Sequence, residues 1–389
     1  MNILLLAPQP FYQDRGTPIA VKLLAQTLGE LGHSVHLLVF AEGEEIVIPR
    51  VTIHRHIPIP GIANIKPGLS LKKLICDFFF FIKCMQLVRK HDFQLVHAVE
   101  ESVFMALVLK KIFKIPYVYD MDSCMSVQLV DKFPSLGLVR RIMEWLEKAA
   151  ITGSIGVLAV CKALEDIVKK CAPGKLTARL EDITLLESGS EGDENLREEL
   201  GINGLVLMYV GNLEKYQGID LLLAGFKEAV ARRSDLALVL IGGKKEDIQS
   251  YQQQTKQFGI AANVFFCGPR PVQQLGYYLG QADILVSPRT QGNNTPMKIY
   301  SYLDSGIPVL ATKLPTHTQV LDEDISCLVK PIPADMAEGI LILAEDKVLR
   351  ERIAGKARQR VQEEYSLPAF QRKLKIFYEK LEDRLDSRL

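Results

Sequence analysis

The chain has 389 residues, with 48% hydrophobic residues and 47 Lys and Arg against 46 Asp and Glu. Because a single hydrophobic core usually stops growing below roughly 250–300 residues, this length predicts at least two domains. The net charge of +1 gives the molecule no strong attraction to polyanions, so we expect no nucleic-acid partner.

The seven cysteines are scattered, and none forms a Cys-x-x-Cys pair. This pattern disfavours a disulfide framework and a structural zinc site, and it indicates a reducing, cytoplasmic compartment. The apolar run Ile3–Ala7 follows Met1 and Asn2 without the basic region or cleavage site of a signal peptide. No run of about 18 apolar residues occurs, so no membrane-spanning helix is expected.

Short apolar runs alternate with longer amphipathic stretches in the first half, which is the pattern of βαβ units. Right-handed crossovers between such units give a doubly wound parallel sheet. The single tryptophan, Trp145, falls in an amphipathic stretch and is expected in the core. The expected strands are Asn2–Pro8, Ser34–Phe40, Val51–Ile57, Phe93–Val99, Pro116–Asp120 and Gly156–Cys161, and the expected helices include Thr17–Leu31 and Leu138–Thr152.

A second alternating series follows a polar, glycine-bearing segment at Glu187–Gly204, which we interpret as a linker. Its expected strands are Leu205–Val210, Leu236–Ile241, Val264–Cys267, Ile284–Ser287, Val309–Ala311 and Cys327–Val329. The expected helices that close the chain are Ala334–Ala344, Lys347–Tyr365 and Ala369–Leu385.

The sequence therefore predicts an α/β protein with two Rossmann-like doubly wound domains and a cleft between them. The predicted domains are 1–186 and 205–365, joined by the linker 187–204. The last segment, 366–389, is predicted to be a helix that packs back on the first domain. Ligands of such sheets bind at the carboxyl ends of the strands, so the loops that follow strands are the candidate site.

Four segments of the second half place glycines and polar residues after predicted strands. Leu207–Leu222 combines a strand, a turn at Gly211, a polar loop and a helix that begins near Gly218. Val239–Gly243 and Asn263–Arg270 are strands that end in turns, and Ser287–Thr312 holds a loop, a helix and a further strand. Glycine in such turns lets the backbone approach a phosphate, and the start of a helix offers unpaired N–H groups.

In this order and spacing, the four segments resemble the retaining glycosyltransferases of family 4, the glycogen-synthase-like group with the two-domain GT-B fold. The resemblance covers essentially the whole chain, since Asp14–Pro18 and Leu31–Val35 are similar to the N-terminal features of that family. It implies transfer of a sugar, with retention, from a nucleoside-diphosphate sugar to a hydroxyl acceptor in glycan or polysaccharide biosynthesis.

The resemblance also implies a donor site. The backbone of the loop before the fourth helix, and the N-terminus of that helix, would bind the diphosphate at Asn294, Thr295, Pro296 and Met297. The loop Gly268–Arg270 would frame the nucleobase, with Gly268 and Arg270 as site residues. Gly16 would lie across the cleft, near the transferred sugar, and Gly211 would allow close approach of the backbone.

The sequence departs from the family pattern where cations and an acid are expected. Asn212 and Gln217 occupy the places of the two usual cations, Ser301 occupies the place of the acid that binds ribose, and Gln291 lies near the place of its upstream partner. This indicates either a variant donor geometry or a loss of turnover. We favour the variant geometry, because two of the cations that could substitute bracket the expected phosphate loop. The candidate replacements are Lys215, Arg289, Lys298 and Arg15.

The resemblance requires neither a nucleophile nor a metal, and no cofactor is expected beyond the nucleotide sugar as co-substrate. The family is thought to react by front-face attack, with the leaving phosphate helping to remove the acceptor proton. Asp120 and Asp122 form an Asp-x-Asp pair that could hold a metal, but the pair lies in the half without the donor-like loops. We therefore interpret Asp122 as an acceptor-orienting or basic group; the alternative is that it caps the following segment.

His97 ends a predicted strand and precedes Glu100 and Glu101. A histidine at a strand end beside carboxylates could orient an acceptor, so His97 joins Asp122 as a candidate catalytic residue. The alternative is a structural histidine hydrogen-bonded at the domain surface.

The segment Lys66–Lys90 contains six basic residues and one acid around a run of four phenylalanines. At helical spacing, Phe80 falls opposite the main apolar stripe, among Lys72, Lys73 and Lys83. An aromatic side chain on a basic face suits contact with the inner surface of an anionic membrane, which would make the protein peripheral and its acceptor lipid-linked. The alternative is that Phe80 packs under a neighbouring loop.

Two rival functions remain open at the level of sequence. A sugar-nucleotide epimerase of the same fold would need carboxylates and histidines that converge on the sugar, and His317 is the only histidine of the second half. A non-catalytic GT-B scaffold or binding protein would explain the departures at Asn212, Gln217 and Ser301.

Overall fold

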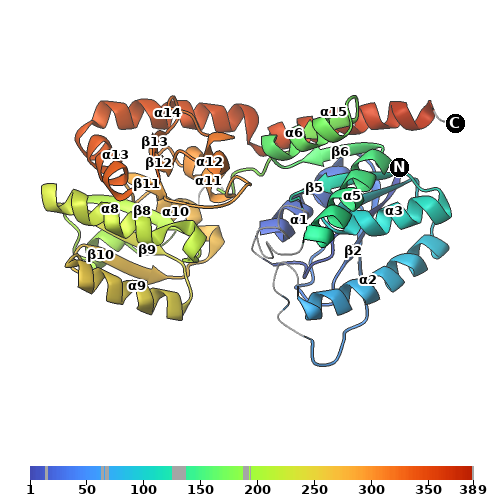
Figure 1. Ribbon diagram of the computed structural model, residues 1–389, viewed down its shortest axis with the longest axis horizontal. Helices are drawn as coiled ribbons and strands as arrows, with labels where there is room; N and C mark the ends of the chain where they lie inside the picture. Colours follow the sequence, from blue (N-terminus) through green and yellow to red (C-terminus); the bar gives the residue numbers. More distant parts are fainter. Residues whose placement is uncertain are drawn as a thin grey trace. The chain divides into compact units, whose positions relative to one another are not determined.

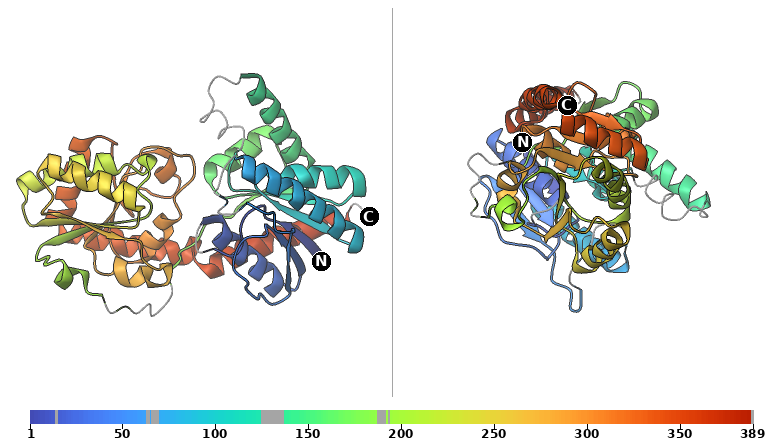
Figure 2. Two further views of the ribbon diagram at one scale, coloured as in Figure 1. Left: turned by 90° about the horizontal axis from the view of Figure 1, so that it is seen from below. Right: turned by 90° about the vertical axis from the view of Figure 1, so that its left-hand side faces the viewer.

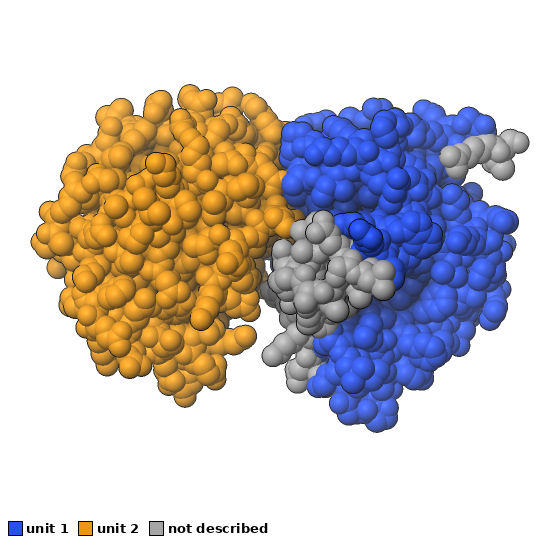
Figure 3. Space-filling model, in the orientation of Figure 1, with its two compact units in different colours: residues 1–181, 371–389 blue, residues 182–370 orange. Residues whose placement is uncertain are grey.

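The computed structural model describes residues 1–13, 16–62, 65, 70–124, 137–186, 192 and 194–387. The chain forms two compact units, which Figure 3 distinguishes by colour. Unit 1 comprises Met1–Glu181 and Gln371–Leu389, and unit 2 comprises Asp182–Phe370.

Unit 1 is built on a seven-stranded sheet in the order β3-β2-β1-β4-β5-β6-β7, with every neighbouring pair of strands parallel. The strands are β1 Asn2–Leu6, β2 Ser34–Val39, β3 Val51–Arg55, β4 Leu95–Val99, β5 Tyr117–Met121, β6 Gly156–Ala159 and β7 Leu176–Arg179. The sequence pattern missed β7, because this short edge strand has no apolar run and no fully buried residue.

Helices cover both faces of this sheet (Figure 1). They are α1 Gly16–Glu30, α2 Leu71–Lys90, α3 Ser102–Phe113, α5 Gly137–Gly153, α6 Lys162–Cys171 and α15 Leu367–Asp386. Side chains of α2, α3, α5 and α6 share one hydrophobic cluster with Val96, Ala98, Tyr117 and Tyr119 of the sheet. Because side chains alternate along a strand, His97 and Asp120 point to the opposite face, where Tyr378 of α15 contacts His97.

Unit 2 has a six-stranded parallel sheet in the order β10-β9-β8-β11-β12-β13. Its strands are β8 Leu205–Val210, β9 Leu236–Ile241, β10 Val264–Gly268, β11 Ile284–Ser287, β12 Val309–Thr312 and β13 Cys327–Val329. Its helices are α7 Leu196–Glu199, α8 Ile219–Arg232, α9 Lys245–Phe258, α10 Leu275–Leu279, α11 Lys298–Asp304, α12 Pro315–Thr318, α13 Pro333–Glu345 and α14 Lys347–Glu364, with 3-10 turns η1 Lys215–Gln217 and η2 Val272–Gln274.

The order in which strands are added to the sheet reverses at equivalent places in the two units. In unit 1 the chain runs outward from β1 to β3 and returns beside β1 with β4; in unit 2 it runs outward from β8 to β10 and returns beside β8 with β11. These reversals are the switch points at which open α/β sheets bind ligands. The predicted fold class, with two doubly wound α/β domains, is confirmed.

Two sequence-based placements are wrong. Phe80 is fully buried and packs edge-to-face on Phe40, with ring centroids 5.9 Å apart, so it lies on the core side of α2 and not on a basic outer face. Trp145 is 65% exposed and is not a core residue. In α2 the side assigned to the apolar stripe was wrong, and in α5 the amphipathic pattern did not show that Trp145 lies on the exposed side.

Candidate functional site

At the switch point of unit 2, the loop after β8 meets the loop after β11. The backbone N–H of Thr290 donates to the carbonyl oxygen of Tyr216 over 3.0 Å. Gly218 has φ +77°, and a Cβ there would lie 2.0 Å from the carbonyl oxygen of Pro288. Only glycine permits this approach, so the two loops are held together at a position where no side chain fits.

Lys298, the first residue of α11, lies behind this junction. Its ammonium nitrogen is 3.8 Å from the centroid of the Tyr209 ring and donates to Gln217 Oε1 over 3.3 Å. Burial, with a smaller contribution from the nearby Arg289, lowers the pKa of Lys298 well below its usual value.

Arg289 follows β11 and shares the junction. Its guanidinium lies 5.1 Å from the centroid of Tyr216 and donates to the carbonyl oxygen of Asn294 over 3.1 Å, while its Nε is buried without a partner in the described part of the chain. Burial also lowers the pKa of Arg289. Among the residues that the structure describes, no carboxylate pairs with either Arg289 or Lys298. Within the described residues, the junction therefore holds two basic side chains without a carboxylate partner, which makes it a candidate place for an anion.

The residues that replace the family's cations have structural contacts here. Asn212 Oδ1 accepts from the backbone N–H of Glu214 over 3.3 Å, and its amide nitrogen donates to the Tyr216 hydroxyl over 3.4 Å. Gln217 is buried and accepts from Lys298. Lys215, a third candidate cation, is exposed on the 3-10 turn η1. Arg15 lies outside the described residues.

The loop Gly292–Met297 lies next to Arg289. Gly292 has φ +124°, and a Cβ there would lie 2.7 Å from the Arg289 guanidinium. Thr295 is buried, and its hydroxyl has no hydrogen-bond partner within the described residues. Among the described residues, the Thr295 hydroxyl is thus a further buried polar group that no protein atom satisfies, in the loop next to Arg289. The helix α11 begins at Lys298, directly after this loop.

Two predicted donor residues are already engaged by protein groups. Ser301 is fully buried, and its hydroxyl accepts from the backbone N–H of Leu185 over 3.0 Å, so the structure does not place it on an accessible surface. Arg270 forms a bidentate ion pair with Glu194, at 2.9 and 2.6 Å, and Glu194 also accepts from the Tyr278 hydroxyl over 2.6 Å. Arg270 therefore ties the loop after β10 to the segment that leads into α7.

His317 was not predicted as part of the site, yet its hydrogen bonds hold the residues that lead into the junction. It is fully buried, its Nδ1 lies 2.9 Å from the carbonyl oxygen of Thr312, and its Nε2 lies 2.9 Å from the Ser287 hydroxyl. Burial lowers the pKa of His317 to about 4, so the ring is neutral at pH 7, Nδ1 donates to the carbonyl and Nε2 accepts. Thr312 in turn donates to the carbonyl oxygen of Arg289 over 2.5 Å.

A cavity of about 640 Å³ opens beside the same edge of the sheet, at the loops after β9 and β10. It is lined by Gly243, Lys244, Lys245, Glu246, Ile248, Gln249, Gln252 and Pro269. Its rim adjoins the loop after β8, because a Cβ on Gly242 would lie 2.2 Å from the carbonyl oxygen of Gly211. Gly268, which has φ +66°, precedes the rim residue Pro269.

In unit 1, His97 lies beside the switch point but does not reach the surface. It is fully buried, with Nδ1 2.7 Å from the Tyr378 hydroxyl and Nε2 3.3 Å from Asp120 Oδ2. The predicted direct contact of His97 with an acceptor is not supported by this burial. The side chain of Asp120 is 14% exposed, so it is the member of this chain of contacts that solvent reaches.

Carboxylates gather at the ends of β4 and β5. Burial, together with Glu101, raises the pKa of Glu100 to about 7. Lys73 is ion-paired with Glu101 and with Asp77, so it does not project to the outside as predicted. Asp122 is partly buried directly after β5. Across the described residues, no three His, Cys, Asp or Glu side chains converge as ligands of a metal ion.

The first residue of α1, Gly16, has φ +33°, and open space surrounds the position of a Cβ. It follows β1 at the switch point of unit 1.

Comparisons with known proteins agree with this architecture. Residues 15–178 match the family model "Glycosyltransferase Family 4", and residues 192–360 match "Glycosyl transferases group 1". The phosphatidyl-myo-inositol mannosyltransferase of Mycolicibacterium smegmatis is 23% identical over 373 residues, which is 93% of this chain and 89% of that protein. The D-inositol 3-phosphate glycosyltransferase of Corynebacterium aurimucosum is 24% identical over 313 residues, 74% of this chain and 71% of that protein.

Among solved structures, the Anabaena protein HepE in complex with UDP superposes with a TM-score of 0.75 at 18% identity, covering 98% of this chain and all of that one. Sucrose-phosphate synthase from Thermosynechococcus elongatus gives a TM-score of 0.78 at 18% identity, over 98% and 99% of the two chains. The two family models define a glycosyltransferase, and the likeness to these solved structures shows that it has the GT-B fold. The chain belongs to the family 4 glycosyltransferases, as its sequence motifs indicate.

Proposed function

We propose that this glycosyltransferase uses a nucleoside-diphosphate sugar, and that its diphosphate binds between Arg289 and Lys298. The observation that carries the proposal is the pair of partly buried cations without counterions, next to the unpartnered hydroxyl of Thr295. A diphosphate would neutralise both charges and accept hydrogen bonds from all three side chains. The HepE structures with UDP and with UDP-glucose support a uridine nucleotide as the first candidate.

The reaction follows from this placement of charge. An acceptor hydroxyl oxygen bonds to the anomeric carbon on the face that the leaving group vacates, so configuration is retained. The bond from the anomeric carbon to the phosphate oxygen breaks, its electron pair goes to the diphosphate, and the acceptor proton passes to that oxygen. Arg289 and Lys298 stabilise the negative charge that develops there, so the proposal requires neither a metal nor a cofactor.

The acceptor is proposed to be a glycan or a lipid-linked sugar that unit 1 binds, with Asp122 or the His97–Asp120 pair orienting its hydroxyl. The names of the M. smegmatis relative and of the Salmonella typhimurium lipopolysaccharide 1,2-N-acetylglucosaminetransferase support acceptors of this kind. All seven cysteines are free, which supports the proposal of a reducing compartment, the cytoplasm. Peripheral contact at the membrane is proposed together with a lipid-linked acceptor. No helix within the described residues is long and apolar enough to cross a membrane.

Calorimetry with UDP, GDP and their sugars tests the donor site. We expect one nucleotide to bind, and we expect Arg289→Ala and Lys298→Met each to weaken it at least about tenfold, since each removes a charge-assisted contact. Lys256→Ala, which removes an exposed cation from α9, is the matched control and should bind as the wild type does. Absence of binding by every nucleotide at millimolar concentration would refute the assignment.

The epimerase alternative loses its only histidine in unit 2, because His317 is buried, neutral and fully hydrogen-bonded. Binding of the sugar nucleotide without release or transfer of the sugar would instead identify a scaffold that retained the donor site.

A further inference from the structure

The outer surface of one helical layer of unit 1 exposes large apolar side chains. On α2, Leu71, Leu74 and Phe78 are 75%, 55% and 62% exposed. Ile112 of α3 is 58% exposed, and Ile142 and Trp145 of α5 are 50% and 65% exposed. The three helices cover the same face of the sheet, because their buried sides share one hydrophobic cluster. Exposed apolar residues on three neighbouring helices indicate an interaction surface rather than isolated exceptions.

The same surface is basic. Exposed cations accompany the apolar residues on each helix, with Lys72 on α2, Lys111 on α3, and Arg141 and Lys148 on α5. Among the described side chains of these helices, Glu144 is the only exposed acid, since Asp77 is paired with Lys73 and Glu147 is buried against Tyr119. An apolar surface with a basic border complements an anionic lipid interface, where apolar groups enter the acyl boundary and cations remain among the headgroups.

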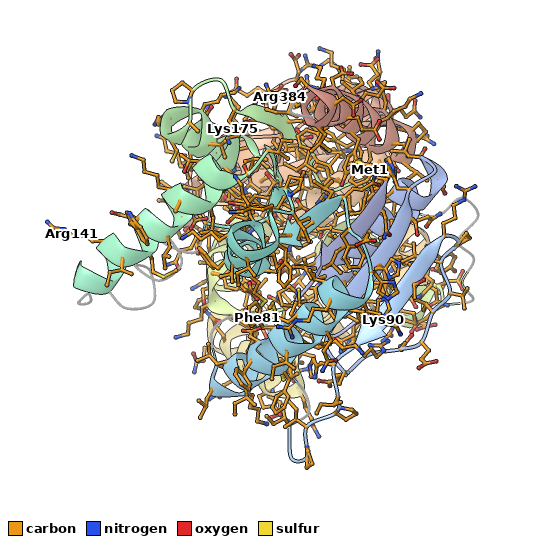
Figure 4. All side chains as sticks on the ribbon, turned by 90° about the vertical axis from the view of Figure 1, so that its right-hand side faces the viewer. Met1, Phe81, Lys90, Arg141, Lys175 and Arg384 are labelled. Carbon is orange, nitrogen blue, oxygen red and sulfur yellow. The ribbon has the colours of Figure 1, made fainter. Side chains whose placement is uncertain are left out.

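The shape of this layer also suits a bilayer. The helix α5 extends outward from unit 1 in both views of Figure 2, and Figure 4 shows Arg141 at its outer end, beyond the other helices of the layer. Ile142 and Trp145 therefore stand on a helix that projects from unit 1.

We propose that the outer face of α2, α3 and α5 docks on an anionic lipid bilayer, with Leu74, Phe78 and Trp145 entering the interface. The sequence pattern placed Phe80 at the membrane, but Phe80 is buried. The membrane contact is therefore assigned to the opposite side of α2. It does not depend on the donor site, because the two lie in different units.

Trp145 reports on this docking directly, because it is the only tryptophan. With the full-length protein and vesicles of phosphatidylcholine and phosphatidylglycerol, we expect co-flotation, a blue shift of tryptophan emission, and quenching by brominated lipid chains. All three effects should weaken with salt and be absent with phosphatidylcholine alone.

The double variant Leu74→Glu/Phe78→Glu should lower vesicle binding at least about tenfold. The control is a single variant with a matched apolar-to-acid change, Val348→Glu, at a residue of α14 that is 76% exposed. It should bind vesicles as the wild type does, and every variant should still bind nucleotide. Equal vesicle binding by wild type and double variant would overturn the proposal. So would a dimer in vesicle-free solution that the same substitutions dissociate, since the surface would then be a contact between two copies.

Discussion

The ammonium nitrogen of Lys298 lies 3.8 Å from the centre of the Tyr209 ring, and its described hydrogen-bond partner is the amide oxygen of Gln217. An aromatic face and an amide replace the carboxylate that usually accompanies a buried ammonium. Such an environment supplies no counter-charge, so protonating this amine costs stability in the ligand-free protein, and an anionic ligand would remove that cost.

Lys298→Met should therefore separate stability from binding. Removing a buried, unneutralised charge is expected to raise the free energy of unfolding of the ligand-free protein by about 1–3 kcal/mol. The same change should weaken nucleotide binding. Denaturant unfolding with and without nucleotide measures both effects, and a loss of ligand-free stability would contradict the view that the charge is unneutralised.

Donor binding should take up protons. Burial lowers the pKa of Lys298 in the free protein, and a diphosphate beside it would raise that pKa again. Binding should accordingly strengthen as pH falls through the lowered pKa of Lys298. Calorimetry in buffers of different ionisation enthalpy measures this uptake, and Lys298→Met should abolish it. Equal uptake by the variant would assign the protonation to another group.

The stability of unit 2 should decrease in acid because of His317. Its pKa is about 4 in the folded chain and 6.5 in the unfolded chain, so below pH 6.5 the unfolded state binds the proton first. The stabilisation is complete above pH 6.5 and is lost as pH falls toward 4, by at most about 3 kcal/mol. Between pH 7 and pH 5, the melting temperature should decrease less for His317→Gln than for the wild type. At pH 7 the variant should be the less stable of the two proteins. Parallel curves for the two proteins would contradict this origin.

Tyr378→Phe should destabilise unit 1 through His97. The substitution leaves Nδ1 of a fully buried histidine without the hydroxyl that lies 2.7 Å away, at a cost of about 1–3 kcal/mol. Denaturant unfolding measures the change, while nucleotide affinity should be unaltered because the donor loops lie in unit 2. A change in affinity with unaltered stability would show that the contact acts on the donor site instead.

Gly218→Ala should disrupt the loop junction. The new Cβ would meet the carbonyl oxygen of Pro288 at 2.0 Å and would also occupy a backbone conformation with φ +77°. Gly201→Ala is the matched control, because Gly201 has φ +63° and open space around it. Gly201→Ala should lower the free energy of unfolding by about 1 kcal/mol. Gly218→Ala should lower it by more and should also weaken nucleotide binding. Equal losses of stability in the two variants would show that the loops at the junction can move to accommodate the Cβ.

The sequence was sufficient for the fold, because buried parallel strands are continuous apolar runs and glycine-bearing turns after them mark the carboxyl edge of each sheet. Arg289 and Lys298 were expected at the donor site because the family resemblance requires cations there, and that role stays a prediction. The edge strand β7 has no such run and was missed.

The partners of single side chains could not be predicted. Nothing local indicates that Ser301 binds the backbone of Leu185, that Glu194 binds Arg270, or that Tyr378 reaches His97, since these contacts join residues 76 to 281 positions apart. For Phe80 and Trp145, helical periodicity defined the stripe but not which side faced the sheet. The roles assigned to the site residues remain predictions until nucleotide binding is measured.

The route of α15 has a consequence for synthesis. Leu374, Phe377 and Tyr378 belong to the core of unit 1, yet they follow the whole of unit 2 in the chain. Unit 2 is uninterrupted and can fold as soon as it leaves the ribosome. Unit 1, whose synthesis begins before that of unit 2, therefore completes its core only when Gln371–Leu389 has been made. A chain that ended near Phe370 would carry a complete unit 2 and a unit 1 with an open core.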